Sequence, residues 1–152
     1  MKDPAEQNHH CSVVEIAGTG ILIEGKSGTG KTSLALGLLE AGKIRKVSAK
    51  LVSDDQAILL AENGNLQASV PGTISGLVEL RGYGVRNIEF KPSCRIDLVG
   101  QLVVDEQLER MPEPMTTRLL NIDLPVLKLP ERHEAQCVRI IFAWLEDNGK
   151  LS

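Results

Sequence analysis

Residues 25–32 read GKSGTGKT, and this stretch decides the fold of the chain. It matches the pattern G-x-x-x-x-G-K-[ST], in which backbone N–H groups wrap phosphate oxygens, the lysine neutralises them and the hydroxyl reaches Mg²⁺. An apolar run precedes the stretch and a helical pattern follows it, as this mechanism requires. The sequence therefore predicts a phosphate-binding loop made of Gly25, Lys26, Ser27, Gly28, Thr29, Gly30, Lys31 and Thr32.

The residues before the loop predict a hairpin. CSVVEI at 11–16 and GILIEG at 20–25 are rich in β-formers, and AGTG between them suits a tight turn. A turn centred near Gly18 pairs Val14 with Leu22 and places His10 opposite Lys26, beside the loop. The residues alone leave open whether this histidine is functional or simply solvated.

The residues after the loop predict an alternating α/β pattern. A helix is expected over 31–41, with Gly42 as its stop. We then expect a strand, an acidic turn and a second strand over 49–60, followed by an Asn-Gly hairpin at 62–66. Residues 71–90 are expected to form a short helix or turn, a loop and a strand. Strands at 95–104 and 124–129 and a closing helix over 132–149 complete the pattern. We expect one domain over 1–152, with residues 1–9 flexible.

Composition narrows the class of protein. The chain has 152 residues, 42% hydrophobic and 24% charged, which suits a folded domain. A net charge of −3 provides no basic field for nucleic acid.

Cys11, Cys94 and Cys137 lack metal-ligand spacing, so reduced thiols are expected. No apolar run approaches the ~18 residues of a membrane span, and the polar start lacks a signal-peptide core, so we expect a cytoplasmic protein without membrane contact.

Two acidic pairs compete for the site beside the phosphates. Asp54 and Asp55 end the strand that follows the loop's own helix, and a right-handed crossover can return that strand beside the loop strand. Asp105 and Glu106 follow the apolar run QLVV, as the metal-binding and water-activating acids of many ATPases do. Position favours the first pair, while a turn or helix-capping role is the alternative for it.

The ordered set of motifs resembles the catalytic domain of HPr kinase/phosphorylase, in its short form without the N-terminal domain. The resemblance rests on GTGILIEGKSGTGKTSLAL at 18–36, LVSDDQAIL at 51–59, VPGTISGLVELRGYGV at 70–85 and LERMPEP at 108–114. It implies an α/β P-loop domain like the nucleotide-binding domain of phosphoenolpyruvate carboxykinase, with a mixed sheet and antiparallel hairpins. It also implies a homohexamer acting with ATP and Mg²⁺ on a serine of HPr, in the bacterial phosphotransferase system.

The resemblance assigns roles where residues match. His10 falls on the family's essential histidine, Lys31 on its phosphate lysine and Thr32 on its Mg²⁺ hydroxyl. Asp55 falls on the carboxylate that takes the seryl proton, and Asp54 is the acid beside it.

The later motifs add two residues. Glu79 falls on a second Mg²⁺-associated position and Arg110 on a later active-site arginine. A surface ion pair of Glu79 with Arg81, and a solvated Arg110, are the alternatives.

This sequence also departs from the family pattern. His10 is followed by Cys11 and Ser12 rather than glycine and valine, and the family's C-terminal segment tied to the reverse, phosphorylase reaction is reduced to KLPERHE at 128–134. The kinase direction is therefore the leading hypothesis. An NTPase or small-molecule kinase using Asp105 and Glu106, and a non-catalytic nucleotide-sensing module, are the alternatives.

Overall fold

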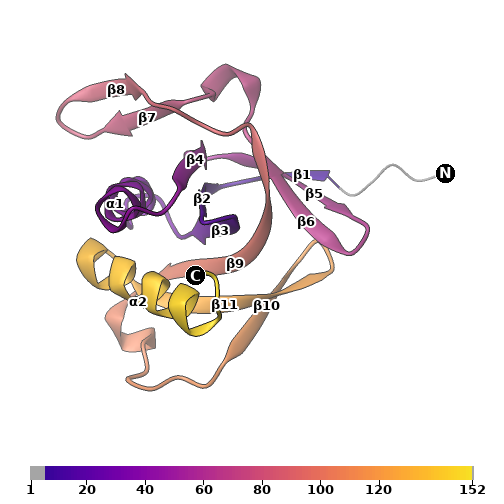
Figure 1. Cartoon of the computed structure of the whole chain (residues 1–152), viewed down its shortest axis with the longest axis vertical. Helices are drawn as coiled ribbons and strands as arrows, with labels where there is room; N and C mark the ends of the chain where they lie inside the picture. The colour runs from indigo at the N-terminus through magenta and orange to yellow at the C-terminus, as the bar shows by residue number, and fades with distance from the viewer. Residues whose placement is uncertain (1–5, 152) are drawn as a thin grey trace.

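A curled mixed sheet carries the phosphate loop at one edge, as the computed structural model of residues 6–151 shows (Figure 1). The elements are β1 (Glu6–His9), β2 (Cys11–Ile16), β3 (Thr19–Glu24), α1 (Lys31–Arg45), β4 (Ala49–Ser53), β5 (Ala57–Glu62), β6 (Asn65–Ser69), η1 (Gly72–Ile74), β7 (Leu77–Leu80), β8 (Gly84–Asn87), β9 (Ser93–Val103), η2 (Asp105–Gln107), β10 (Met115–Leu119), β11 (Ile122–Pro130) and α2 (Glu134–Asp147). The strand order is β1-β5-β6-β9-β3-β2-β4, with β11 also on β9 and β10 on β11. The predicted α/β class, with a mixed sheet and antiparallel hairpins, is confirmed.

The β2–β3 hairpin forms as predicted, but its register differs by one residue. Val14 pairs with Ile21, not with Leu22, and Cys11 pairs with Glu24. The turn is the two-residue loop Ala17–Gly18, both with positive φ (49° and 81°), rather than a turn centred on Gly18. Two-residue turns of this hand match the twist of the strands. The predicted pairing of His10 with Lys26 is therefore wrong.

Of the residues 1–9 that were expected to be flexible, residues 6–9 form a strand and residues 1–5 lie outside the described part. Glu6–His9 form β1, which pairs antiparallel with β5 and places His9 opposite Ala57. The edge of β5 offers unpaired backbone groups that this segment satisfies.

The loop strand β3 lies between β9, which runs parallel to it, and β2, which runs antiparallel. β4 pairs with β2, so it does not return directly beside β3 as the sequence suggested. Because β3 and β4 are both antiparallel to β2, they run in the same direction. Their carboxyl ends therefore meet at one edge of the sheet, which is where the loop and the acidic turn lie.

The two helices cover one face of the sheet and lie side by side (Figure 1). Leu34 and Leu38 of α1 pack with Ile141 and Phe142 of α2 in a buried cluster. Alternate residues of β2 and β3 point to a second buried cluster inside the curl of the sheet. Neither helix in residues 6–151 is long and apolar enough to cross a membrane.

Helix α1 runs past its predicted end. Gly42 lies inside the helix, which ends at Arg45 with Lys46 in the left-handed region (φ 60°). The glycine serves packing instead, since a Cβ there would lie 2.5 Å from the Cβ of Ala49.

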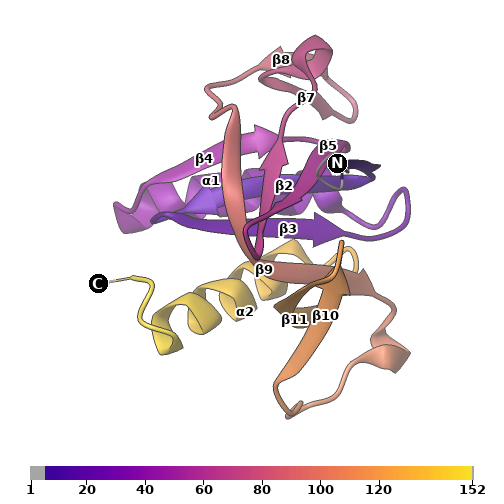
Figure 2. The ribbon, with the colours of Figure 1, turned by 90° about the vertical axis from the view of Figure 1, so that its right-hand side faces the viewer.

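The segment 71–90 forms a projecting hairpin of β7 and β8 in place of the expected loop and single strand (Figure 2). The sequence also did not indicate β10, whose five residues pair with β11. The three cysteines are free and buried, as reduced thiols would be.

Candidate active site

The phosphate loop is preformed between β3 and α1. Gly28 and Gly30 have positive φ values of 81° and 104°, which only glycine adopts without strain. The hydroxyl of Thr29 donates to the carbonyl of Lys26 at 2.7 Å and closes the loop on itself. No side chain caps the start of α1 at Gly30, so the N–H groups of its first turn are left for an anion.

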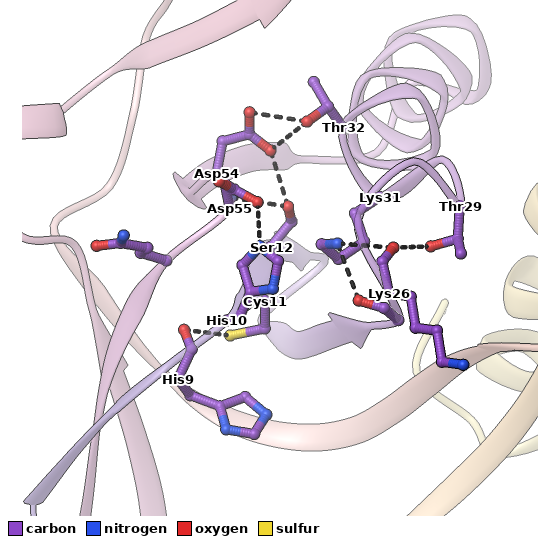
Figure 3. A network of polar contacts seen from close by, with 12 residues as sticks. His9, His10, Cys11, Ser12, Lys26, Thr29, Lys31, Thr32, Asp54 and Asp55 are labelled. Carbon is purple, nitrogen blue, oxygen red and sulfur yellow. Dashed lines mark hydrogen bonds and ion pairs between the residues drawn. The ribbon is translucent and has the colours of Figure 1, made fainter.

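Lys31 holds its charge inside the loop. Its side chain is 5% exposed, and its ammonium donates to the carbonyls of Gly25 at 2.9 Å and Lys26 at 3.2 Å. Figure 3 shows the Lys31 ammonium held against the backbone of the loop by these contacts. A phosphate bound in the loop would exchange these carbonyl contacts for charge-assisted ones.

Asp54 reaches the loop from the end of β4. It is 8% exposed, and the Thr32 hydroxyl lies 2.9 Å from both of its carboxylate oxygens. The buried hydroxyl of Ser12 donates to the same carboxylate at 2.8 Å. Burial raises the pKa of Asp54, and the hydrogen bonds from Ser12 and Thr32 partly oppose that rise.

Asp55 and His10 form a hydrogen-bonded pair beside this buried acid. The Nε2 of His10 donates to the Oδ1 of Asp55 at 2.6 Å, and the two side chains are 49% and 62% exposed. Asp55 has a positive φ of 69°, and its backbone N–H donates to the Ser12 hydroxyl at 3.1 Å. The pair therefore faces solvent, where a group on another molecule can approach it.

One open recess of about 670 Å³ is lined by loop residues 27–32 together with Asp54 and Asp55, and His10 is not part of its lining. Glu79 and Arg81 reach the recess from the projecting hairpin. Glu134 and Cys137 of α2 also line it.

Arg132 fastens the segment before α2 to the loop. Its backbone N–H donates to the carbonyl of Thr29 at 3.0 Å, and its Nε donates to the carbonyl of Gly28 at 3.1 Å. The residue has a positive φ of 60° and lines the recess. Sequence reasoning did not place it in the site, and the short KLPERHE stretch was the only signal available.

Arg110 is not brought to this recess. It is exposed in the segment between η2 and β10, and it is not among the residues that line the recess. Asp105 and Glu106 do not line this recess but an adjoining one of about 360 Å³, which shares Arg132 and His133 with it. The Nε2 of His133 lies 4.0 Å from a carboxylate oxygen of Asp105.

The donor atoms in the recess suit Mg²⁺. Thr32 and Glu79 present a hydroxyl and a carboxylate, the hard oxygen ligands that this ion prefers. In residues 6–151 no three His, Cys, Asp or Glu side chains cluster so that they could hold a metal by themselves. Mg²⁺ in phosphoryl-transfer sites usually takes one or two protein oxygens plus the substrate's phosphates, so a sparse set fits.

A phosphate loop after a central strand, a buried lysine and an acid on the loop's hydroxyl together define an α/β domain with the features of a P-loop protein. The chain belongs to the HPr serine kinase C-terminal domain family, whose model matches residues 4–148.

Two curated relatives support membership in this family. The chain is similar to an HPr kinase/phosphorylase of Chlorobium luteolum, 35% identical over 137 residues that cover 82% of this chain and 40% of that protein. It is likewise 35% identical to one of Geobacillus thermodenitrificans, over 81% of this chain and 42% of that protein. The chain thus spans about two fifths of the length of these curated relatives.

A solved structure shares the fold. The Hpr(Ser) kinase/phosphatase of Coxiella burnetii superposes with a TM-score of 0.79 at 23% identity, over 94% of this chain and 90% of that one.

Proposed function

We propose that this chain is an ATP- and Mg²⁺-dependent kinase that phosphorylates a serine of the phosphocarrier protein HPr. The observation that carries the proposal is the exposed His10–Asp55 pair, held at 2.6 Å beside a preformed phosphate loop. The names of the relatives, HPr kinase/phosphorylase, support it. The proposal covers the kinase direction and places the protein in the cytoplasm with its substrate.

The loop binds and aligns the nucleotide's phosphates. Its N–H groups and the Lys31 ammonium are already directed inward before anything binds, so little reorganisation is needed. Thr32 and Glu79 would hold Mg²⁺, which when bound neutralises charge on the phosphate oxygens. Asp54 fixes the direction of the Thr32 hydroxyl by accepting its hydrogen bond.

Asp55 is the base for the acceptor serine. The seryl O–H proton passes to its carboxylate as the seryl oxygen bonds to the γ-phosphorus and the bond from that phosphorus to ADP breaks. His10 fixes the orientation of the carboxylate through its 2.6 Å hydrogen bond. Because Asp55 is exposed, a serine on a protein surface can reach it without unfolding either partner.

The β7–β8 hairpin is our candidate for contacts with other chains. Tyr83 and Val85 are 79% and 65% exposed in and next to its turn, and Glu79 and Arg81 at the same end of the hairpin line the recess. We propose that this hairpin meets HPr or a second copy of the chain. The homohexamer expected from family resemblance is checked by the mass of the protein in solution.

The positions of Asp105 and Glu106 do not favour an ATPase in which these acids bind the metal and activate water. Asp105 and Glu106 line the adjoining recess and not the one at the loop, and Asp105 faces His133 rather than the Thr32 hydroxyl. In such an ATPase the acid after the strand would meet that hydroxyl through the metal.

The test is transfer of radiolabel from γ-labelled ATP to purified HPr and to HPr in which the acceptor serine is alanine. We expect label on the first and none on the second. Absence of serine-dependent label, from a protein that still binds nucleotide, would overturn the proposal. So would an enzyme that tolerates Asp55→Asn but loses activity with Glu106→Gln.

A further inference from the structure

Ser12 makes one hydrogen bond to each of the two acids through its hydroxyl. Its side chain is completely buried at the start of the β2–β3 hairpin. The hydroxyl donates its one proton to the Asp54 carboxylate at 2.8 Å and accepts the backbone N–H of Asp55 at 3.1 Å. One side chain thus binds the side chain of one acid and the backbone of the next.

The strand geometry explains why a side chain is needed at this point. β2 and β4 pair with a register shift between Val13 and Val14, and their last paired residues are Val13 and Ser53. Such a bulge bends the strand and ends regular pairing. The N–H of Asp55, just beyond that pairing, therefore takes a hydroxyl as its acceptor in place of a strand carbonyl.

Asp55 needs this restraint because its backbone is in the left-handed region, with φ 69°. Residues other than glycine hold that conformation when their surroundings impose it, although aspartate tolerates it better than most. In residues 6–151 the exposed carboxylate is hydrogen-bonded to one side chain, that of His10, so the direction of that carboxylate depends on the backbone beneath it.

We propose that Ser12 is a positioning residue whose hydroxyl holds Asp54 and Asp55 as one rigid unit against the phosphate loop. Through Asp54 it reaches the Thr32 hydroxyl, and through the backbone of Asp55 it sets the direction of the base. The expected effect of Ser12 on the kinetics rests on the proposed kinase function, whereas its expected effect on the backbone of Asp55 does not.

The matched pair Ser12→Thr and Ser12→Val tests this, since the two side chains have the same shape and differ in the hydroxyl. The first readout is amide hydrogen exchange at Asp55 in the nucleotide-free protein, followed by NMR. Ser12→Val should speed exchange about tenfold or more, because the N–H loses its acceptor. Ser12→Thr should stay within about threefold of the unsubstituted protein.

The second readout is the kinetics of HPr phosphorylation. Ser12→Val should lower kcat about tenfold or more through misorientation of the base. KM for the Mg²⁺-nucleotide should change by less than about threefold, because the contacts of Lys31 with the loop are untouched. Ser12→Thr should recover most of kcat.

Thr19→Val is the control for losing a buried hydroxyl, because Thr19 is 3% exposed at the opposite end of the same hairpin. It should leave both readouts unchanged. If Ser12→Val does not fold, Ser12→Ala removes the hydroxyl without adding bulk.

Normal exchange and kcat in Ser12→Val or Ser12→Ala, or equal damage from threonine and valine, would overturn the proposal. If the protein phosphorylates no HPr at all, the kinetic readout fails with the proposed function, and the exchange of the Asp55 amide still decides the role of Ser12.

Discussion

His10 and Asp55 are 45 positions apart in the chain, yet the Nε2 of one lies 2.6 Å from the Oδ1 of the other. His10 lies at the bend between β1 and β2, and Asp55 lies in the turn that follows β4. The antiparallel pairing of β2 with β4 brings those two ends together. This carboxylate and imidazole, held next to a phosphate loop, are the groups that we propose receive the acceptor serine.

Replacing Asp55 by asparagine should lower kcat for HPr phosphorylation by about 10²- to 10⁴-fold, because the amide cannot take the seryl proton. Nucleotide affinity, measured by calorimetry, should stay within about threefold, since within residues 6–151 the hydrogen bonds of Asp55 go to His10 and Ser12 and not to the loop. Glu106→Gln is the matched control and should leave kcat unchanged. Equal losses from both substitutions would count against Asp55 as the base.

Lys31→Ala should weaken nucleotide binding about 100-fold or more, because the buried ammonium is the loop's inward-facing charge. Lys26→Ala removes a charge from the same loop, but this side chain is exposed, so its effect should be less than about fivefold. Calorimetric titration with ATP compares the two variants. A similar loss in both would mean that net charge, and not the position of Lys31, governs affinity.

Arg132→Ala should weaken ATP binding about three- to tenfold. The guanidinium is 69% exposed, so its direct contribution is modest, but its Nε holds the Gly28 carbonyl and thereby the shape of the loop. Arg139→Ala removes an exposed arginine from α2 and should have no effect. Faster hydrogen exchange in the loop of Arg132→Ala, with Arg139→Ala unchanged, would show that the fastening acts through loop order.

Glu24 should make stability depend on pH. Hydrogen bonding from His9, 3.0 Å away, holds the pKa of Glu24 below its ordinary value of 4.5. A lowered pKa in the folded state favours folding above the ordinary pKa, and this gain is lost as the pH falls through the lowered value.

The measurement is urea unfolding of the protein and of Glu24→Gln across this range. The variant should be less stable by about 1 kcal/mol at pH 7, and the difference should disappear in acid. Glu62→Gln, at an exposed position of β5, should show no such convergence. A Glu24→Gln difference that persists unchanged in acid would exclude the pKa as its source.

Local patterns were sufficient for most of the fold. The loop, the two helices and the hairpins follow from glycine positions and from apolar periodicity, which act over a few residues. The predictions that were wrong concerned how strands pair and how elements pack against one another. Gly42 was expected to end α1, but it is buried against Ala49, a contact that the helix pattern does not contain.

The residues of the candidate site show the same difference between what local patterns predict and what pairing and packing decide. Lys31 and Thr32 are defined by their spacing within the loop, and Asp54 and Asp55 by following a strand. Arg110 was named from a motif alone, and the structure leaves it exposed outside the recess, since a short motif in an irregular segment does not determine where that segment runs. Arg132 lies 104 positions from Gly28, which no local pattern connects to it.

By itself, the sequence determined the phosphate loop, the acid pair and the family, because these depend on residue type at short spacing. Only the tertiary structure decided that Ser12 joins both acids, that Thr32 bonds Asp54 across an intervening strand, and that His10 meets Asp55 rather than facing Lys26. The reason is physical. A shift of one residue in the β2–β3 register, or a different neighbour for β4, would keep every local pattern intact and yet turn different side chains toward the loop.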